Sequence, residues 1–274
     1  MRIDLHTHTT ASDGALTPQA LCERALARGV ELLAITDHDT CAGWRAAEAL
    51  TRRPQLIPAA EFSCQWRNAA IHVVGLGIDP DHIACRDGFA RLQRSRIERA
   101  RIIDQRLARL GFSDTAEEAI ALAGDSQVGR PHFAQVLVER GAVASPSEAF
   151  DRYLGAGKPG DVRALWPDLA EVTRWICQAG GVAVLAHPLK YKLTATRLRL
   201  LVEEFKAAGG GAIEVVTGRP QPDLLAPLVR LCHTYALEAS AGSDFHQPGQ
   251  FWAEVGEVAP LPAGCQPVWE RWLN

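Results

Sequence analysis

The sequence has no excess of charge of either sign. Its 274 residues carry 29 Lys and Arg against 32 Asp and Glu, which gives a formal net charge of −3. A strongly basic field that would recruit nucleic acid over the whole surface is therefore missing, and so is an acidic interaction tail. Binding partners must be inferred from local features, and none of these indicates a protein partner.

Long hydrophobic runs are missing too. Nowhere do about 18 apolar residues follow one another, as a membrane-spanning helix requires. The N-terminal MRIDLHTHTT has neither the basic nor the apolar region of a secretory signal. We therefore expect a cytoplasmic protein that does not associate with a membrane.

The seven cysteines include no CxxC pair. Their odd number and scattered spacing favour neither a disulfide framework nor a thiolate zinc site. We expect them to pack as small apolar residues. Imidazole and carboxylate side chains remain as candidate metal ligands.

Short apolar runs alternate with helical patterns through the first third of the chain and again after residue 160. This alternation is typical of βα units, which build parallel sheets. The expected strands are 2–5, 31–35, 55–60, 70–78, 182–186, 212–216 and 238–241. The pattern predicts an α/β fold, namely a distorted TIM-like (β/α)7 barrel interrupted by an insertion.

The insertion is marked by a stretch in which only helical patterns occur. The expected helices are 87–110, 113–123, 131–140 and 146–154, and turns that contain glycine separate them. We therefore predict barrel segments at 1–86 and 160–274. Residues 87–159 would form a helical cap that recognises the substrate.

Two histidines, His6 and His8, lie two positions apart at the end of the first expected strand. Strand geometry projects both side chains to the same side of the chain, as a shared metal ion requires. Other candidate ligands follow later strands, and in a barrel the carboxyl ends of the strands form one face. Only His72 lies near the start of its strand. The expected ligands are His6, His8, Asp13, His38, Glu61, His72, His187, Asp244 and His246.

This ligand set is too large for a single ion. Imidazole and carboxylate without thiolate suit Mn²⁺, Zn²⁺ or Fe²⁺, and each ion takes about four to six ligands. We therefore expect two or three divalent ions in each chain. Such a cluster can clamp phosphate oxygens, convert water to hydroxide and neutralise the leaving oxygen, which predicts hydrolysis of a phosphate ester.

The motifs that carry these ligands together resemble the PHP (polymerase and histidinol phosphatase) family of metal-dependent phosphoesterases. A single HxH motif would be weak evidence, but the combination is specific and covers nearly all of 1–85 and 160–258. The matching motifs are His6-Thr-His8 with Asp13, Thr36-Asp-His38, Glu61, His72, Ala186-His187-Pro188 and Gly242-Ser-Asp244-x-His246.

The resemblance implies three metal positions and catalytic roles for Glu61, His187 and Asp244. The first ion would be held by His6, His8, Glu61 and Asp244, the second by the bridging Glu61 with His72 and His187, and the third by Asp13, His38 and His246. Some relatives carry His where Asp13 stands, which changes the charge at the third position. Asp37 would orient a neighbouring ligand. We expect Mn²⁺, with Zn²⁺ or Fe²⁺ as alternatives.

Two features of the insertion indicate anion binding. In Ser126-Gln-Val-Gly-Arg130-Pro-His132, Arg130 lies at the start of an expected helix, where a guanidinium and the helix dipole both favour phosphate. Downstream, the glycine-rich loop around Lys158 offers backbone amides and a cation. An ordinary helix cap and a flexible hinge are the alternative explanations.

These features look like the nucleotide-acting PHP subgroup. The resemblance implies removal of the 3′-phosphate of nucleoside 3′,5′-bisphosphates, such as adenosine 3′,5′-bisphosphate, by metal-activated hydroxide. Ser126, Arg130 and Lys158 would hold the 5′-phosphate, and His132 would contact either phosphate. The alternatives are a 5′-3′ exoribonuclease acting on short RNA, a histidinol phosphate phosphatase, and a metal-binding module without catalytic activity.

Overall fold

The computed structural model describes residues 1–124, 126–162 and 165–273. The chain divides into two compact units, one formed by Met1–Phe89 and Pro167–Asn274 and the other by Ala90–Trp166. The sequence predicted divisions at 86/87 and 159/160. No helix in the described part of the chain is long and apolar enough to cross a membrane.

The larger unit begins with a parallel three-stranded sheet in the order β1-β2-β3. Its elements are β1 (Ile3–Asp4), α1 (Pro18–Ala27), β2 (Leu32–Ala34), α2 (Ala42–Glu48) and β3 (Gln55–Ile57). Helix α1 starts at Pro18, because the Thr17 side chain accepts a hydrogen bond from the Ala20 amide and Pro18 occupies the first turn. Its buried Leu21 packs in one cluster with Leu33 and Ile35 of the second βα unit.

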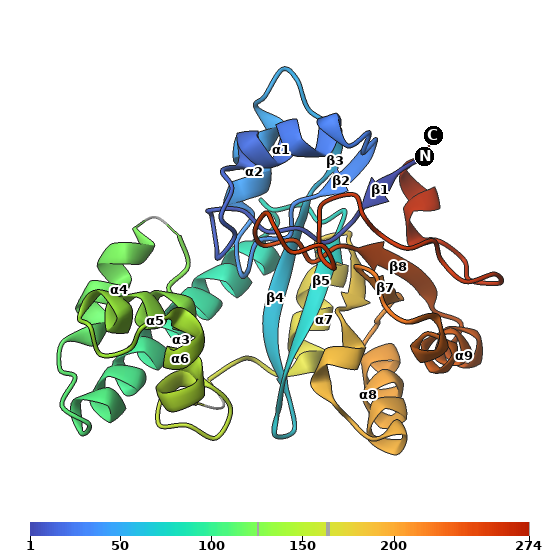
Figure 1. Cartoon of the computed structure of the whole chain (residues 1–274). Helices are drawn as coiled ribbons and strands as arrows, with labels where there is room; N and C mark the ends of the chain where they lie inside the picture. The colour runs from blue at the N-terminus through green and yellow to red at the C-terminus, as the bar shows by residue number, and fades with distance from the viewer. Residues whose placement is uncertain (125, 163–164, 274) are drawn as a thin grey trace. The chain divides into compact units, whose positions relative to one another are not determined.

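A second sheet of five strands completes this unit (Figure 1). The strands are β4 (Ala59–Trp66), β5 (Ala69–Leu76), β6 (Val182–Leu185), β7 (Ala212–Thr217) and β8 (Glu238–Gly242). Strands β6, β7 and β8 are parallel, whereas β4 with β5 forms a long antiparallel hairpin and β5 with β6 is antiparallel. The longer connecting helices are α7 (Leu169–Gln178), α8 (Ala195–Ala207) and α9 (Ala226–Tyr235).

The mixed α/β class agrees with expectation, but the arrangement of strands needs correction. The described strands form two sheets, not one closed barrel of seven strands. The expected strand 55–60 is split at Pro58, which has no backbone N–H to donate to a ladder. The chain after Pro58 belongs to the hairpin, so Glu61 lies inside β4 and not at the end of a strand.

Close contacts join the two sheets at one end. Isolated bridges connect Thr7 with Phe245 and His38 with Glu61, both in parallel sense. Gly242 makes the first approach possible, because a Cβ atom on it would lie 2.3 Å from the Cβ of His6. Residues that follow β1, β2 and β8 are thus brought beside the start of β4.

Among its described residues, the smaller unit has helices as its regular secondary structure, joined by turns and loops. Its elements are most of α3 (Ile83–Ala108), then α4 (Thr115–Ala123), α5 (Arg130–Glu139), α6 (Pro146–Ala149) and the π-helical turn η1 (Phe150–Leu154). These match the helices expected from the sequence. The unit has its own core, in which Leu107, Phe133, Leu137 and Leu154 are almost completely buried, so the insertion is stabilised by packing of its own.

Candidate metal centre

His6 and His8 reach the centre from the chain segment that follows β1. The backbone there runs alongside the segment after β8, since His8 N–H donates to the Phe245 carbonyl and Asp244 N–H donates to the His6 carbonyl. Both histidines are buried, at 1% and 0% exposure. The two-residue period therefore aims two imidazoles into the interior, as the sequence predicted.

The carboxylate of Glu61 lies at the middle of the cluster. Its Oε2 is 3.2 Å from His6 Nε2, 3.3 Å from His8 Nε2 and 3.2 Å from His38 Nδ1. Its Oε1 is 3.0 Å from His72 Nδ1 and 2.9 Å from His187 Nε2. One buried carboxylate is thus within reach of five imidazoles, which come from both sheets.

Several of these buried atoms lack a hydrogen-bond partner among the described residues. They are His6 Nε2, both ring nitrogens of His8, His38 Nδ1, Glu61 Oε2, His72 Nδ1 and His187 Nδ1. Buried polar atoms are nearly always satisfied in folded proteins, so a group of orphans at one point calls for an explanation. Lone pairs that converge without hydrogen-bond geometry are what divalent cations bind, and the donor set therefore fits metal ions.

Of the remaining ligand candidates, Asp244 is buried, whereas Asp13 and His246 are partly exposed. Asp244 Oδ1 is 3.3 Å from His8 Nε2 and 3.5 Å from His6 Nε2. The Asp13 carboxylate is 3.5 Å from His246 Nε2 and 3.8 Å from His38 Nε2. Asp13, His38 and His246 are only partly buried, so substrate can reach the centre from their side.

All nine ligand candidates from the sequence come together here. Four overlapping groups have ligand atoms within 4.8 Å of one another, so each could hold one ion. These groups are His6-His8-Glu61, His6-His187-Asp244, His38-Glu61-His72 and His8-Asp13-His38-His246. Because His6, His8, His38 and Glu61 each belong to two groups, the ligands form one connected centre.

Protonation differs across the centre. Burial lowers the pKa of His8, but the carboxylates of Asp244 and Glu61 outweigh it and raise that pKa to about 10. Burial dominates at His38, whose pKa falls to about 3, and it also lowers the pKa of His246. Without metal, His8 therefore carries a proton that an ion must displace, whereas His38 and His246 are already neutral.

Sequence reasoning missed Glu214. This buried residue of β7 places its carboxylate oxygens 3.1 and 3.2 Å from His6 Nδ1 and accepts a 2.6 Å hydrogen bond from the His187 backbone amide. A carboxylate on Nδ1 leaves Nε2 of His6 to face the centre, a common arrangement behind metal-binding histidines. The signal was a lone acid within the apolar run Ala212-Ile-Glu-Val-Val216.

Other side chains fix the backbone around the ligands. Asp4 in β1 accepts hydrogen bonds from the amides of Ser243 and Gly256, and burial raises its pKa to about 6. Asp37 accepts from the amide and hydroxyl of Thr9, next to His8. Asp37 thus holds the loop between His8 and Asp13, which agrees with its expected orienting role.

Two ligand positions have unusual backbone geometry. His187 has φ 29° and Asp244 has φ 55°. Residues other than glycine adopt such positive φ values only at an energetic cost. Beside them, the Lys190 ammonium forms an ion pair with Asp244. Strain and a local cation are therefore concentrated where β6 and β8 deliver their ligands.

The four expected substrate contacts lie in the helical unit, and three of them, Ser126, Arg130 and His132, have a described side-chain partner within it. The Arg130 guanidinium donates to the Leu154 carbonyl at 3.0 Å and lies 3.8 Å from the Asp161 carboxylate. His132 Nδ1 accepts from the Gly129 amide, and the Ser126 hydroxyl donates to the Ala123 carbonyl. The Lys158 side chain is exposed. Arg130 thus joins the helix start to both ends of the Lys158 loop.

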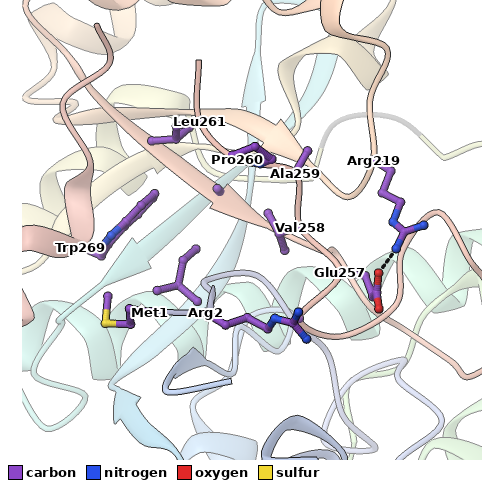
Figure 2. A pocket seen from close by; sticks show the side chains of 12 residues that line it. Met1, Arg2, Arg219, Glu257, Val258, Ala259, Pro260, Leu261 and Trp269 are labelled. Carbon is purple, nitrogen blue, oxygen red and sulfur yellow. Dashed lines mark ion pairs between the residues drawn. The ribbon is translucent and has the colours of Figure 1, made fainter. Parts of the chain in front are cut away.

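A cavity of about 590 Å³ lies in the larger unit and is separate from the candidate metal centre (Figure 2). None of the nine metal-ligand candidates lines it. Arg219 forms an ion pair with Glu257 there, and the Arg2 guanidinium donates to the Arg28 carbonyl. Its two cations therefore already have partners within the chain.

Comparison with known proteins gives consistent matches. The PHP domain family matches residues 4–158. The chain is 44% identical over 273 residues to the 5′-3′ exoribonuclease Rnm of Salmonella typhimurium, covering 98% of this chain and 93% of the relative. It is 40% identical over 272 residues to a 3′,5′-nucleoside bisphosphate phosphatase of Chromobacterium violaceum, covering 98% and 95%.

Solved structures agree with these matches. An amidohydrolase from Chromobacterium violaceum, with bound sulfate and no metal, gives a TM-score of 0.89 at 39% identity, covering 99% of this chain and 95% of the other. A metal-dependent phosphoesterase from Bifidobacterium adolescentis gives 0.79 at 27% identity, covering 97% and 92%. Both units of the chain therefore have structural counterparts.

The Glu214 carboxylate should matter for metal binding. Glu214→Gln removes the charge behind His6 Nδ1, so we expect the affinity for Mn²⁺ to fall about 10- to 100-fold with the fold retained. Metal titration by calorimetry would measure this. Glu203→Gln, which changes an acid paired with Arg199 away from the centre, is the matched control. Equal affinities in the two variants would contradict the role of Glu214.

Metal binding should release protons. The folded-state pKa of His8, about 10, exceeds its ordinary value of about 6.5, so below pH 10 an entering ion must displace a proton. We expect Mn²⁺ affinity to rise with pH from 6.5 to 9, by about tenfold per unit for each proton released. Calorimetry in two buffers of different ionisation enthalpy would measure the release. Identical heats in both buffers would show that none occurs.

Proposed function

Because this chain belongs to the PHP family of metal-dependent phosphoesterases, we propose that it removes the 3′-phosphate of nucleoside 3′,5′-bisphosphates. Adenosine 3′,5′-bisphosphate would give AMP and inorganic phosphate. The observation that carries this proposal is the set of five imidazoles around the Glu61 carboxylate, together with the relatives that match nearly the whole chain. Metal-dependent hydrolysis of phosphate esters is the chemistry common to those relatives.

We assign two or three divalent ions to the nine ligands, with Mn²⁺ preferred over Zn²⁺ or Fe²⁺. Glu61 would bridge the first two ions, one held with His6, His8 and Asp244 and the other with His72 and His187, while Asp13, His38 and His246 would hold the third. Bound ions would neutralise phosphate oxygens and lower the pKa of water toward neutrality. Metal analysis of the purified protein would test the assignment.

The chain's own residues orient this chemistry. Glu214 holds His6 and the backbone of His187 in place, and Asp37 holds the loop that carries Asp13. Lys190 brings a positive charge to the side of Asp244. Donors fixed before substrate arrives need no reorganisation during the reaction, which is how preorganised charge lowers a barrier.

A 5′-3′ exoribonuclease is the second candidate, because the relative from Salmonella typhimurium is named for that activity. Both reactions break the same bond. Water oxygen bonds to phosphorus, the bond from phosphorus to the 3′-oxygen breaks, and that oxygen takes a proton. The candidates differ only in whether the phosphorus also carries a second nucleotide, so one metal centre could serve both.

We further propose that the helical unit binds the non-reacting 5′-phosphate through Ser126, Arg130 and Lys158, with His132 contacting either phosphate. Both described polar contacts of Arg130 are made through Nη1, whereas a guanidinium has five N–H donors in a fork that matches phosphate. Binding energy from this remote phosphate would help orient the reacting one.

A substrate panel tests the function. The panel contains adenosine 3′,5′-bisphosphate, AMP, a short RNA with a 5′-phosphate, and histidinol phosphate, each assayed with Mn²⁺. We expect the highest kcat/KM for the bisphosphate, because AMP and histidinol phosphate each lack one of its two phosphates and the RNA carries a second nucleoside on the scissile phosphorus. A higher value for histidinol phosphate would overturn the assignment. Asp244→Asn is the negative control, since any activity that survives it would not belong to this centre.

Arg130→Ala should separate the two phosphates. We expect kcat/KM for adenosine 3′,5′-bisphosphate to fall about 10- to 100-fold, the loss of one charged hydrogen-bonding contact of about 1.5–3 kcal/mol. Adenosine 3′-monophosphate should lose much less. Arg152→Ala, which removes an exposed arginine paired with Glu148 in the same unit, is the matched control. Equal losses on both substrates would exclude Arg130 from the 5′-phosphate role.

A further inference from the structure

A pocket of about 230 Å³ adjoins the metal centre within the larger unit. It shares His187 and Glu214 with the centre, and its other walls come from the segments after β6 and β7 and from α9. These segments include the short helices η2 (Pro188–Tyr191) and η3 (Pro222–Leu224). A ligand bound at the metals can therefore extend into this pocket without leaving the unit.

The walls of the pocket are mainly apolar. The apolar side chains that matter are Pro188, Leu189, Pro220, Leu224 and Leu228. Leu189 and Leu224 are 38% and 50% exposed, although large aliphatic side chains are usually buried. No aromatic residue is among the lining residues. The surface suits the flat face or edge of a small organic group, held by van der Waals contact.

Lys190 connects this pocket with the metal centre. Its side chain lines the pocket, and its ammonium group is paired with the Asp244 carboxylate. At this junction the ammonium could also donate to a phosphate oxygen of a substrate held at the centre. The pocket thus combines an apolar wall with one cation on the side of the reacting phosphate.

We propose that this pocket holds the nucleoside esterified to the far side of the scissile phosphate, that is, the second nucleotide of a 5′-phosphorylated dinucleotide or short RNA. This inference rests on the proposed function and deepens it by assigning phosphodiesters to the same centre. A volume of 230 Å³ is below the ~300–1,000 Å³ of sites for drug-sized ligands. It fits one base or one sugar, and the aliphatic wall offers little to distinguish one base from another.

The chemistry is consistent with this occupant. Water oxygen bonds to phosphorus and the bond to the 3′-oxygen of the first nucleotide breaks, while a proton passes to that oxygen. The second nucleoside stays attached to phosphorus through its 5′-oxygen, so the pocket holds it throughout the step. In a 3′,5′-bisphosphate the scissile phosphorus carries no second nucleoside, and the pocket contributes no contact.

Truncation of the exposed leucines tests the proposal. The variants are Leu224→Ala and the double variant Leu189→Ala with Leu224→Ala, and Leu273→Ala, at an exposed leucine outside the pocket, is the matched control. The measured quantity is kcat/KM for a 5′-phosphorylated dinucleotide divided by kcat/KM for adenosine 3′,5′-bisphosphate. We expect this ratio to fall about threefold in the single variant and about tenfold in the double variant, through a higher KM for the dinucleotide.

Binding without turnover gives a second measurement. A dinucleotide with a methylene group in place of the bridging 3′-oxygen cannot be cleaved at that bond, so its Kd reports binding alone. We expect its Kd to rise about tenfold in the double variant, with metal content and Tm equal to those of the control.

The outcomes separate this inference from the proposed function. An unchanged ratio and Kd in the double variant would overturn the pocket assignment and leave the phosphatase proposal standing. Hydrolysis of the bisphosphate but not of the dinucleotide by the wild-type protein would also overturn the pocket assignment and leave the phosphatase proposal standing. Failure of the wild type on both substrates would overturn the proposed function and this inference together.

Discussion

The structure of the site depends on one buried carboxylate, that of Glu61. An isolated charge in a protein interior is very costly, so this group requires cations or donors on every side. Five imidazoles supply that environment: burial raises the pKa of Glu61, but the surrounding imidazoles, His6 foremost, hold it well below its usual range. Because the five imidazoles come from both sheets, the charge requirement of Glu61 also depends on how the sheets meet. Two backbone contacts bring the sheets together there. They are the close approach of Gly242 to His6 and the bridge between His38 and Glu61.

The ligand candidates could be selected from the sequence because their signals are local. A spacing of two residues at a strand end settles the common direction of His6 and His8, and parallel strands bring their ends to one edge. The position of Glu61 could not be predicted in the same way. An apolar run does not show whether its strand will be parallel or antiparallel to its neighbours. Pro58 was the one sequence feature that indicated a break between β3 and the hairpin. Glu214 was missed because its partner, His6, is 208 residues away in the chain.

The helices of the inserted unit were predictable for the same local reasons, since prolines and glycines mark their ends. The role of Arg130 is a different kind of question. Its place at the start of α5 was evident from the sequence, but its partners, the Leu154 carbonyl and Asp161, lie 24 and 31 residues later in the chain. A guanidinium can support its own loop and bind an anion with different N–H groups. The residue type is known from the sequence, whereas the packing of the folded chain determines which of its N–H donors face a ligand.

Phosphatase and exoribonuclease activities require nearly the same chemistry at the metal centre, because both break the bond between phosphorus and a 3′-oxygen. The nine ligands therefore contain little information about the choice. That choice depends on what surrounds the other substituents of phosphorus, where an inorganic phosphate needs only charge and a diester also needs room for a nucleoside. Leu189, Leu224 and Lys190 line the pocket that we propose for such a substituent. Relatives with matching ligands can differ in substrate without any change at Glu61, and the residues to compare among them are those of the loops after β6 and β7.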